Sequence, residues 1–112
     1  MLSAELAVLK RARELLTRRE HWESDVIARN ARGDIVAATS PEAQSFCLLG
    51  GLIRAVDDIC GDVRKDKQAF SLHHRVLCRV WVMTNGTSLS AYNASKGHKG
   101  VLRLLDRLME TF

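Results

Sequence analysis

The chain has 112 residues and a formal net charge of +4, with 46% hydrophobic and 27% charged residues. This length predicts one globular domain, residues 1–112, that folds without a disulfide or a metal. Three cysteines without a close CxxC pair disfavour a secreted disulfide framework, and the longest apolar run is too short to cross a membrane. We therefore expect a cytoplasmic protein that does not enter membranes.

The first predicted helix begins after Ser3, a good N-cap residue, and ends near Glu20. Leucines recur at helical spacing along it, at Leu2, Leu6, Leu9 and Leu16. Basic side chains occupy the rest of its surface.

A β-hairpin is predicted next. The segment Asn30 to Gly33 separates two apolar runs, 26–28 and 35–37. Gly33 can adopt the positive φ that a tight turn needs. Because an isolated hairpin is marginal in water, its apolar face must lie on the helices.

Ser40 and Pro41 predict the start of a second helix, since serine caps the first turn and proline is tolerated at the first position. Its buried stripe is Phe46, Leu49, Ile53, Val56 and Cys60. Gly50 and Gly51 cost helix stability, which indicates that another backbone approaches closely there. Gly61 ends the helix.

After a charged loop, a third helix is predicted over residues 71–83. The segment 76–83 is rich in β-branched residues, so a strand is the alternative. Asn85-Gly86 breaks the element. A single helical turn at 89–92 and a loop at 93–97 follow. An amphipathic pattern then predicts the last helix, on Val101, Leu104, Leu105, Leu108, Met109 and Phe112. The fold class is mainly α, with about four helices around one core and a short β-hairpin between the first and second.

No catalytic residue, cofactor or metal site is predicted. Cys47 is placed in the second turn of the second helix, where a packed thiol is expected instead of a nucleophile. His74 and Cys78 lie four residues apart and would share a helical face, a spacing that can hold zinc. Two further ligands would be needed, and the sequence offers only scattered histidines.

Five residues are candidates for binding. Trp22, Tyr92 and Asn93 could line a ligand pocket, although an anchoring role suits them better. Arg29 and Arg32 of the hairpin, with the arginines of the first helix, could meet phosphates. No phosphate loop, dinucleotide fingerprint or hydrolase motif is present.

We expect a non-enzymatic interaction or regulatory protein that binds a protein partner or forms a homo-oligomer. The third predicted helix carries more apolar surface than one buried stripe needs, at Trp81, Val82 and Met83, and such surface is hidden in a core or a partner. A weak nucleic-acid-binding accessory protein is the first alternative, and a cysteine-dependent enzyme is the second.

Two blocks, SPEAQSFCLLGGL and SLSAYNASKGHKGVLRLLDRLM, resemble an uncharacterised family of small bacterial and phage proteins, a domain of unknown function. Its members carry a CLLGAL block and a Trp-Asn-Asp (WND) block. The chain departs from that pattern at Tyr92-Asn93-Ala94, which lacks the acidic residue, and at Gly97-His98-Lys99, which lacks the hydroxyl cap. The resemblance implies a phage-associated context and no assigned activity.

Overall fold

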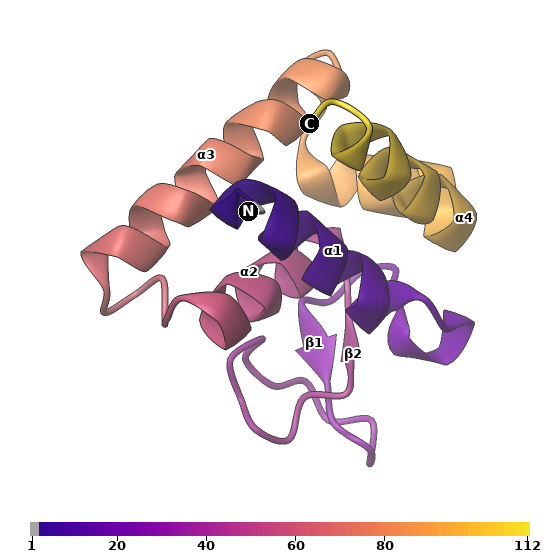
Figure 1. Ribbon diagram of the computed structural model, residues 1–112. Helices are drawn as coiled ribbons and strands as arrows, with labels where there is room; N and C mark the ends of the chain where they lie inside the picture. The colour runs from indigo at the N-terminus through magenta and orange to yellow at the C-terminus, as the bar shows by residue number, and fades with distance from the viewer. Residues whose placement is uncertain (1–2) are drawn as a thin grey trace.

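The computed structural model describes residues 3–112 and shows a mainly helical protein. Within that range four α-helices pack around one core (Figure 1). A short antiparallel strand pair comes between the first and second helices in chain order. The predicted fold class is confirmed. The elements are α1 (Ala4–Leu16), the 3-10 helix η1 (Arg19–His21), β1 (Ala28–Arg29), β2 (Ser45–Phe46), α2 (Leu48–Ile59), α3 (Lys67–Met83) and α4 (Leu89–Met109).

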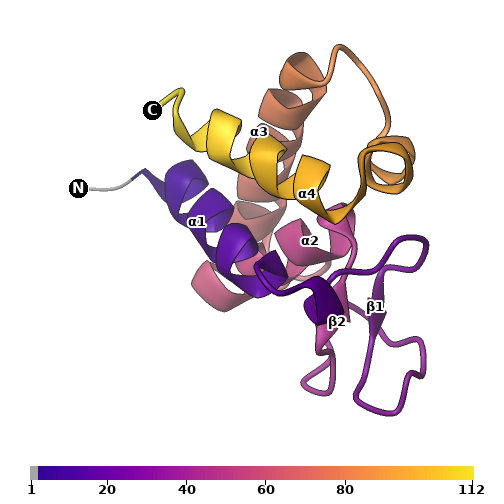
Figure 2. The ribbon, with the colours of Figure 1, turned by 90° about the vertical axis from the view of Figure 1, so that its right-hand side faces the viewer.

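Helix α1 is central to the packing, because its contacts with the other helices, above all with α2 and α4, are the most extensive. Figure 2 shows the strand pair beyond α2, on the side away from α3. The core is mostly aliphatic. Its largest fully buried side chains include Leu9, Leu16, Leu48, Leu52, Leu104, Leu105 and Leu108. Among residues 3–112, no helix combines the length and the apolar character that crossing a bilayer requires.

Helix α1 begins where predicted but ends earlier. The Oγ of Ser3 accepts a hydrogen bond from the Leu6 N–H at 3.1 Å, which caps the first turn. The last helical residue is Leu16, well before Glu20. The Nε2 of His98 lies 2.6 Å from the Leu16 carbonyl oxygen and donates to it. The His98 side chain thus occupies a backbone carbonyl that would accept a hydrogen bond from the next turn if α1 continued.

Strand β1 has a different main partner from the one predicted. The turn at Gly33 forms, with a φ of 87°. The predicted pairing of 26–28 with 35–37 forms only in part: an isolated bridge joins Ile35 to Arg29, and the Val36 N–H donates to the Ala28 carbonyl oxygen at 3.1 Å. The regular strand partner of β1 is β2. Phe46 on β2 is 2% exposed and Ile35 is 63% exposed, so burial of the aromatic ring favours β2 as the partner.

The predicted start of the second helix at Ser40 and Pro41 is wrong. Helix α2 begins at Leu48, and Cys47 is its N-cap. The Sγ of Cys47 accepts a hydrogen bond from the Gly50 N–H at 3.3 Å. The residues just before Cys47 therefore belong to a turn and to β2, not to the helix.

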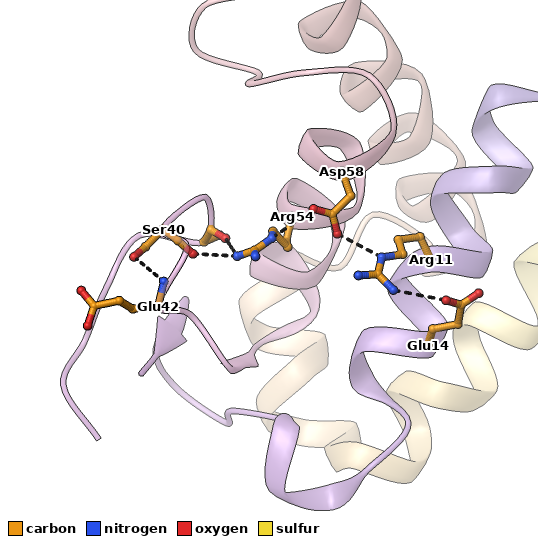
Figure 3. A network of polar contacts seen from close by, with 7 residues as sticks. Arg11, Glu14, Ser40, Glu42, Arg54 and Asp58 are labelled. Carbon is orange, nitrogen blue, oxygen red and sulfur yellow. Dashed lines mark hydrogen bonds and ion pairs between the residues drawn. The ribbon is translucent and has the colours of Figure 1, made fainter. Parts of the chain in front are cut away.

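Arg54 of α2 anchors the loop that precedes the helix. Its Nη1 donates to the carbonyl oxygens of Ala38 and Ser40, at 3.1 and 2.7 Å (Figure 3). The Ser40 carbonyl also accepts from the Ala43 N–H at 3.1 Å, within a turn that does not continue as a helix. The Nε of Arg54 donates to Asp58, which also accepts from Arg11 of α1 at 3.0 Å. One guanidinium thus holds the preceding loop against α2.

Helix α3 begins at Lys67, before the predicted Ser71, because Asp66 is an effective N-cap. The Asp66 Oδ1 accepts from the Ala69 N–H at 3.0 Å. The helix continues to Met83, as predicted. The strand alternative for 76–83 is therefore wrong.

Helix α4 is also longer than predicted. Ser88 caps it and the helix begins at Leu89, so most of the predicted loop 93–97 is helical. Gly97 has a φ of 71° and a ψ of −176°, which interrupts the helix. Because glycine tolerates positive φ, this residue separates a short N-terminal segment from the longer one that contains Val101.

The predicted close approach of another backbone to the two adjacent glycines of α2 is confirmed at Gly50 and not at Gly51. A Cβ atom on Gly50 would overlap the carbonyl oxygen of Ile27. A Cβ on Gly51 would meet only the Leu16 side chain, at 3.0 Å. Backbone cannot move aside as a side chain can, so the two positions differ in what they tolerate.

We expect Gly50→Ala to lower the free energy of unfolding by about 2 kcal/mol, because a backbone clash of about 3 kcal/mol outweighs a helix-propensity gain of about 1 kcal/mol. Gly51→Ala is the matched control and should cost clearly less. Urea denaturation followed by circular dichroism measures both. Equal stability of the two variants would contradict the close approach of Ile27.

Candidate functional site

Trp22 and Asn93, two of the predicted binding residues, contact each other in the core. The Asn93 side chain is buried, with 1% exposed. Its Oδ1 accepts from the Trp22 indole Nε1 at 2.8 Å and from the backbone N–H of Leu48 at 2.9 Å. Its Nδ2 donates to the carbonyl oxygens of Glu23 and Ser24, both at 2.9 Å. All four hydrogen-bonding positions of the amide are thus used within the protein.

Tyr92 and the pocket that borders Asn93 show how the third predicted residue lies relative to the other two. Tyr92 is half-buried and packs against the core. A pocket of about 350 Å³ borders Asn93 and Cys47, but neither Trp22 nor Tyr92 lines it. The structure favours an anchoring role for this group.

The two candidate phosphate contacts, Arg29 and Arg32, are paired locally. The Nε of Arg29 lies 3.1 Å from Glu23, and Arg32 lies 3.3 Å from Asp34 and 3.4 Å from Glu42. Three arginines of the first helical region also have a carboxylate within 3.3 Å: Arg11, Arg13 and Arg18. These charges are compensated, so they attract phosphate less than the sequence suggests.

Cys47 was predicted in the second turn of a helix, but the structure places it at the N-cap of α2. This position favours a thiolate, because helix N–H groups point at the sulfur. Burial nevertheless raises the pKa of the Cys47 thiol, and the hydrogen bonds from Gly50 and Leu49 offset this only in part. Burial therefore disfavours the thiolate form that an activated nucleophile needs.

Helix α3 presents a group of exposed residues to solvent, which we call the α3 face: Phe70, His74, Cys78, Trp81 and Val82. Phe70 is 62% exposed, Trp81 58% and Val82 76%. At 100° per residue these side chains fall within an arc of about 120°. The buried stripe of α3 lies on the opposite side and consists of Ala69, Leu72, Val76 and Val80.

Phe70 was missed by the sequence analysis, because the third helix was predicted to start after it. Asp66 was the available signal. An aspartate followed by a run of helix-forming residues is a common helix start.

A hollow of about 550 Å³ adjoins the α3 face where α3 meets the end of α4. The guanidinium of Arg79 lies at its rim and stacks 4.2 Å from the centre of the Phe112 ring. The residues lining the hollow are Cys78, Arg79, Val82, Met83, Leu108 and Thr111. Its walls are mainly apolar, so it extends the α3 face toward the C-terminus.

His74 and Cys78 lie together on this face, as their spacing predicts. The Nε2 of His74 is 3.6 Å from the Sγ of Cys78. Neighbouring His73 differs, since burial and nearby His74 lower its pKa and its ring faces inward with Nε2 unpartnered. Within residues 3–112, no three or more histidine, cysteine or acidic side chains gather where they could hold a metal ion.

Residues 3–111 match a family described as "Family of unknown function (DUF6197)". The chain belongs to this family. The match confirms the resemblance to a family without an assigned function. No curated protein and no solved structure was found to match.

In this DUF6197 protein we expect Asn93→Asp to lower the free energy of unfolding by about 3 kcal/mol. The variant keeps the shape and Oδ1, but it turns the donor toward Glu23 and Ser24 into an acceptor. Thermal unfolding measures the loss. Exposed Ser95→Ala is the control and should be neutral. Tolerance of Asn93→Asp would show that only the volume of Asn93 matters.

We also expect iodoacetamide to modify Cys47 at neutral pH at least about tenfold more slowly than Cys60 and Cys78, which are exposed. A raised pKa leaves less thiolate at a given pH, and each unit corresponds to a factor of ten. Peptide mass spectrometry over time gives the three rates. Denatured protein is the control, with similar rates at all three sites. Fast labelling of Cys47 in the native protein would support the alternative that the protein is a cysteine-dependent enzyme.

Proposed function

We propose that this protein is a non-enzymatic interaction module that associates with a second copy of itself through the α3 face. The observation that carries the proposal is the exposure of Phe70, Trp81 and Val82 on one side of one helix. Large apolar side chains gathered on a surface are typical of protein-binding sites. Tryptophan in particular contributes strongly when a partner buries it.

The position of α3 supports this reading. Figure 1 shows α3 along one edge of the molecule, so its outer side is open to a partner along its length. The remaining helices hold the inner side through a core that is already filled. The outward residues are therefore available for contact without any change in the fold.

The other predicted functions have weaker support. Most of the arginines expected to contact nucleic acid are paired with carboxylates, and burial raises the pKa of the Cys47 thiol. An accessory or regulatory role in the cytoplasm of a bacterium, or during phage growth, is part of our proposal. A reducing cytoplasm would keep the exposed thiol of Cys78 free.

We expect Trp81→Gln to weaken self-association by about 30-fold, which corresponds to a loss of about 2 kcal/mol at a buried contact. Sedimentation velocity over a range of concentrations, with zinc and with EDTA, measures the dissociation constant. Ile35→Gln is the matched control, since it removes an equally exposed apolar side chain from a loop distant from α3.

Two results would contradict the proposal. One is a chain that stays monomeric at every concentration, both with zinc and with EDTA. The other is an equal loss of association in Trp81→Gln and Ile35→Gln, which would indicate nonspecific hydrophobic contact.

A further inference from the structure

His74 and Cys78 stand one helical turn apart at the middle of the α3 face. Both side chains are exposed, and their ring nitrogen and sulfur approach to 3.6 Å. Zinc binds histidine nitrogen at about 2.0–2.1 Å and cysteine sulfur at about 2.3 Å, usually in a tetrahedron. Two such ligands lie roughly 3.6 Å apart across a tetrahedral angle. The pair therefore already has the separation of two zinc ligands.

One chain supplies only half of such a site. A structural zinc ion takes four protein ligands. The described residues 3–112 bring no third ligand to His74 and Cys78. The missing two ligands must then come from another molecule.

The α3 face is arranged so that a second copy can supply them. Phe70, His74, Cys78 and Val82 follow one another at intervals of four residues. If two α3 helices cross antiparallel about a two-fold axis level with Val76, each His74 faces the other copy's Cys78. Each Phe70 then faces the other copy's Val82. The ligands meet at the centre and exposed apolar side chains flank them, as a two-fold interface requires.

The charges near this centre are partly compensated. Arg75 and Arg79 border the face and share one carboxylate, that of Glu5 of α1, which lies 3.8 Å from the first and 2.6 Å from the second. Each Cys78 thiol releases its proton to solvent when its sulfur binds the metal. Two thiolates then balance the two positive charges of the ion.

We propose that α3 carries half of a zinc site, and that two copies of the chain complete it with two His74 and two Cys78 ligands. This inference rests on the proposed association through the α3 face. It adds a metal ion as the element that fixes the register of the two helices. Zinc is favoured over magnesium or calcium because the ligands are imidazole and thiolate.

The test uses the full chain without an affinity tag, stripped of metal and kept reduced by a phosphine. Zinc is added against a chromophoric chelator, and sedimentation gives the mass. We expect one zinc ion per two chains and conversion to a dimer. Cobalt in place of zinc should give the intense visible bands of a tetrahedral site and the near-ultraviolet absorption of thiolate ligation.

Cys78→Ser and His74→Ala should each weaken zinc binding more than about 100-fold, since loss of a direct ligand exceeds the loss of an outer contact. Cys60→Ser removes another exposed thiol and should leave binding unchanged. Circular dichroism should show that each variant keeps its helices, because the substituted positions are exposed.

Three outcomes would overturn the inference: no zinc binding, one ion on a monomer, or binding unaffected by Cys78→Ser. Dimers that persist in EDTA, and that Trp81→Gln weakens, would also overturn the metal site while supporting the proposed function. Failure to associate under either condition would overturn both.

Discussion

The buried amide of Asn93 is the contact on which the arrangement of the helices depends. It joins the first segment of α4 to the N-terminus of α2 and to the chain around Trp22. An amide group with four partners can be accommodated in only one orientation. It therefore sets where α4 begins relative to α2. Helix α3 connects these two helices, and its buried stripe of Ala69, Leu72, Val76 and Val80 then sets which of its sides remains outside the core.

The sequence predicted the helices better than their ends. Apolar periodicity in the segments that became α1 and α4 correctly indicated helix, because burial of one face dominates helix stability in proteins. Ser40 and Pro41 are a good local start signal, yet the structure uses them in a turn. Non-local contacts hold this arrangement: Arg54 donates to the Ser40 carbonyl, and the N–H of Leu48 donates to Asn93. Neither contact leaves a mark on the local pattern.

The same distinction separates the parts of the candidate site that could be predicted from those that could not. The interval between His74 and Cys78 follows from helix geometry alone, and so does their common face. That this face points to solvent depends on how α3 packs. The distance between the two ligand atoms and the exposure of Phe70 likewise required coordinates. Trp22 and Asn93, candidates for binding from the sequence, contact each other, and their burial favours support of the fold.

The exposed apolar residues of α3 make more sense as a paired surface than as an open one. The core does not need them, because Leu72, Val76 and Val80 already fill the inner side of the helix. Left uncovered, Phe70, Trp81 and Val82 would favour indiscriminate association. A two-fold contact covers both patches at once and leaves none free, whereas a head-to-tail contact would propagate. A central metal site would further restrict the contact to one relative position of the two helices, since its four ligands assemble only in one register.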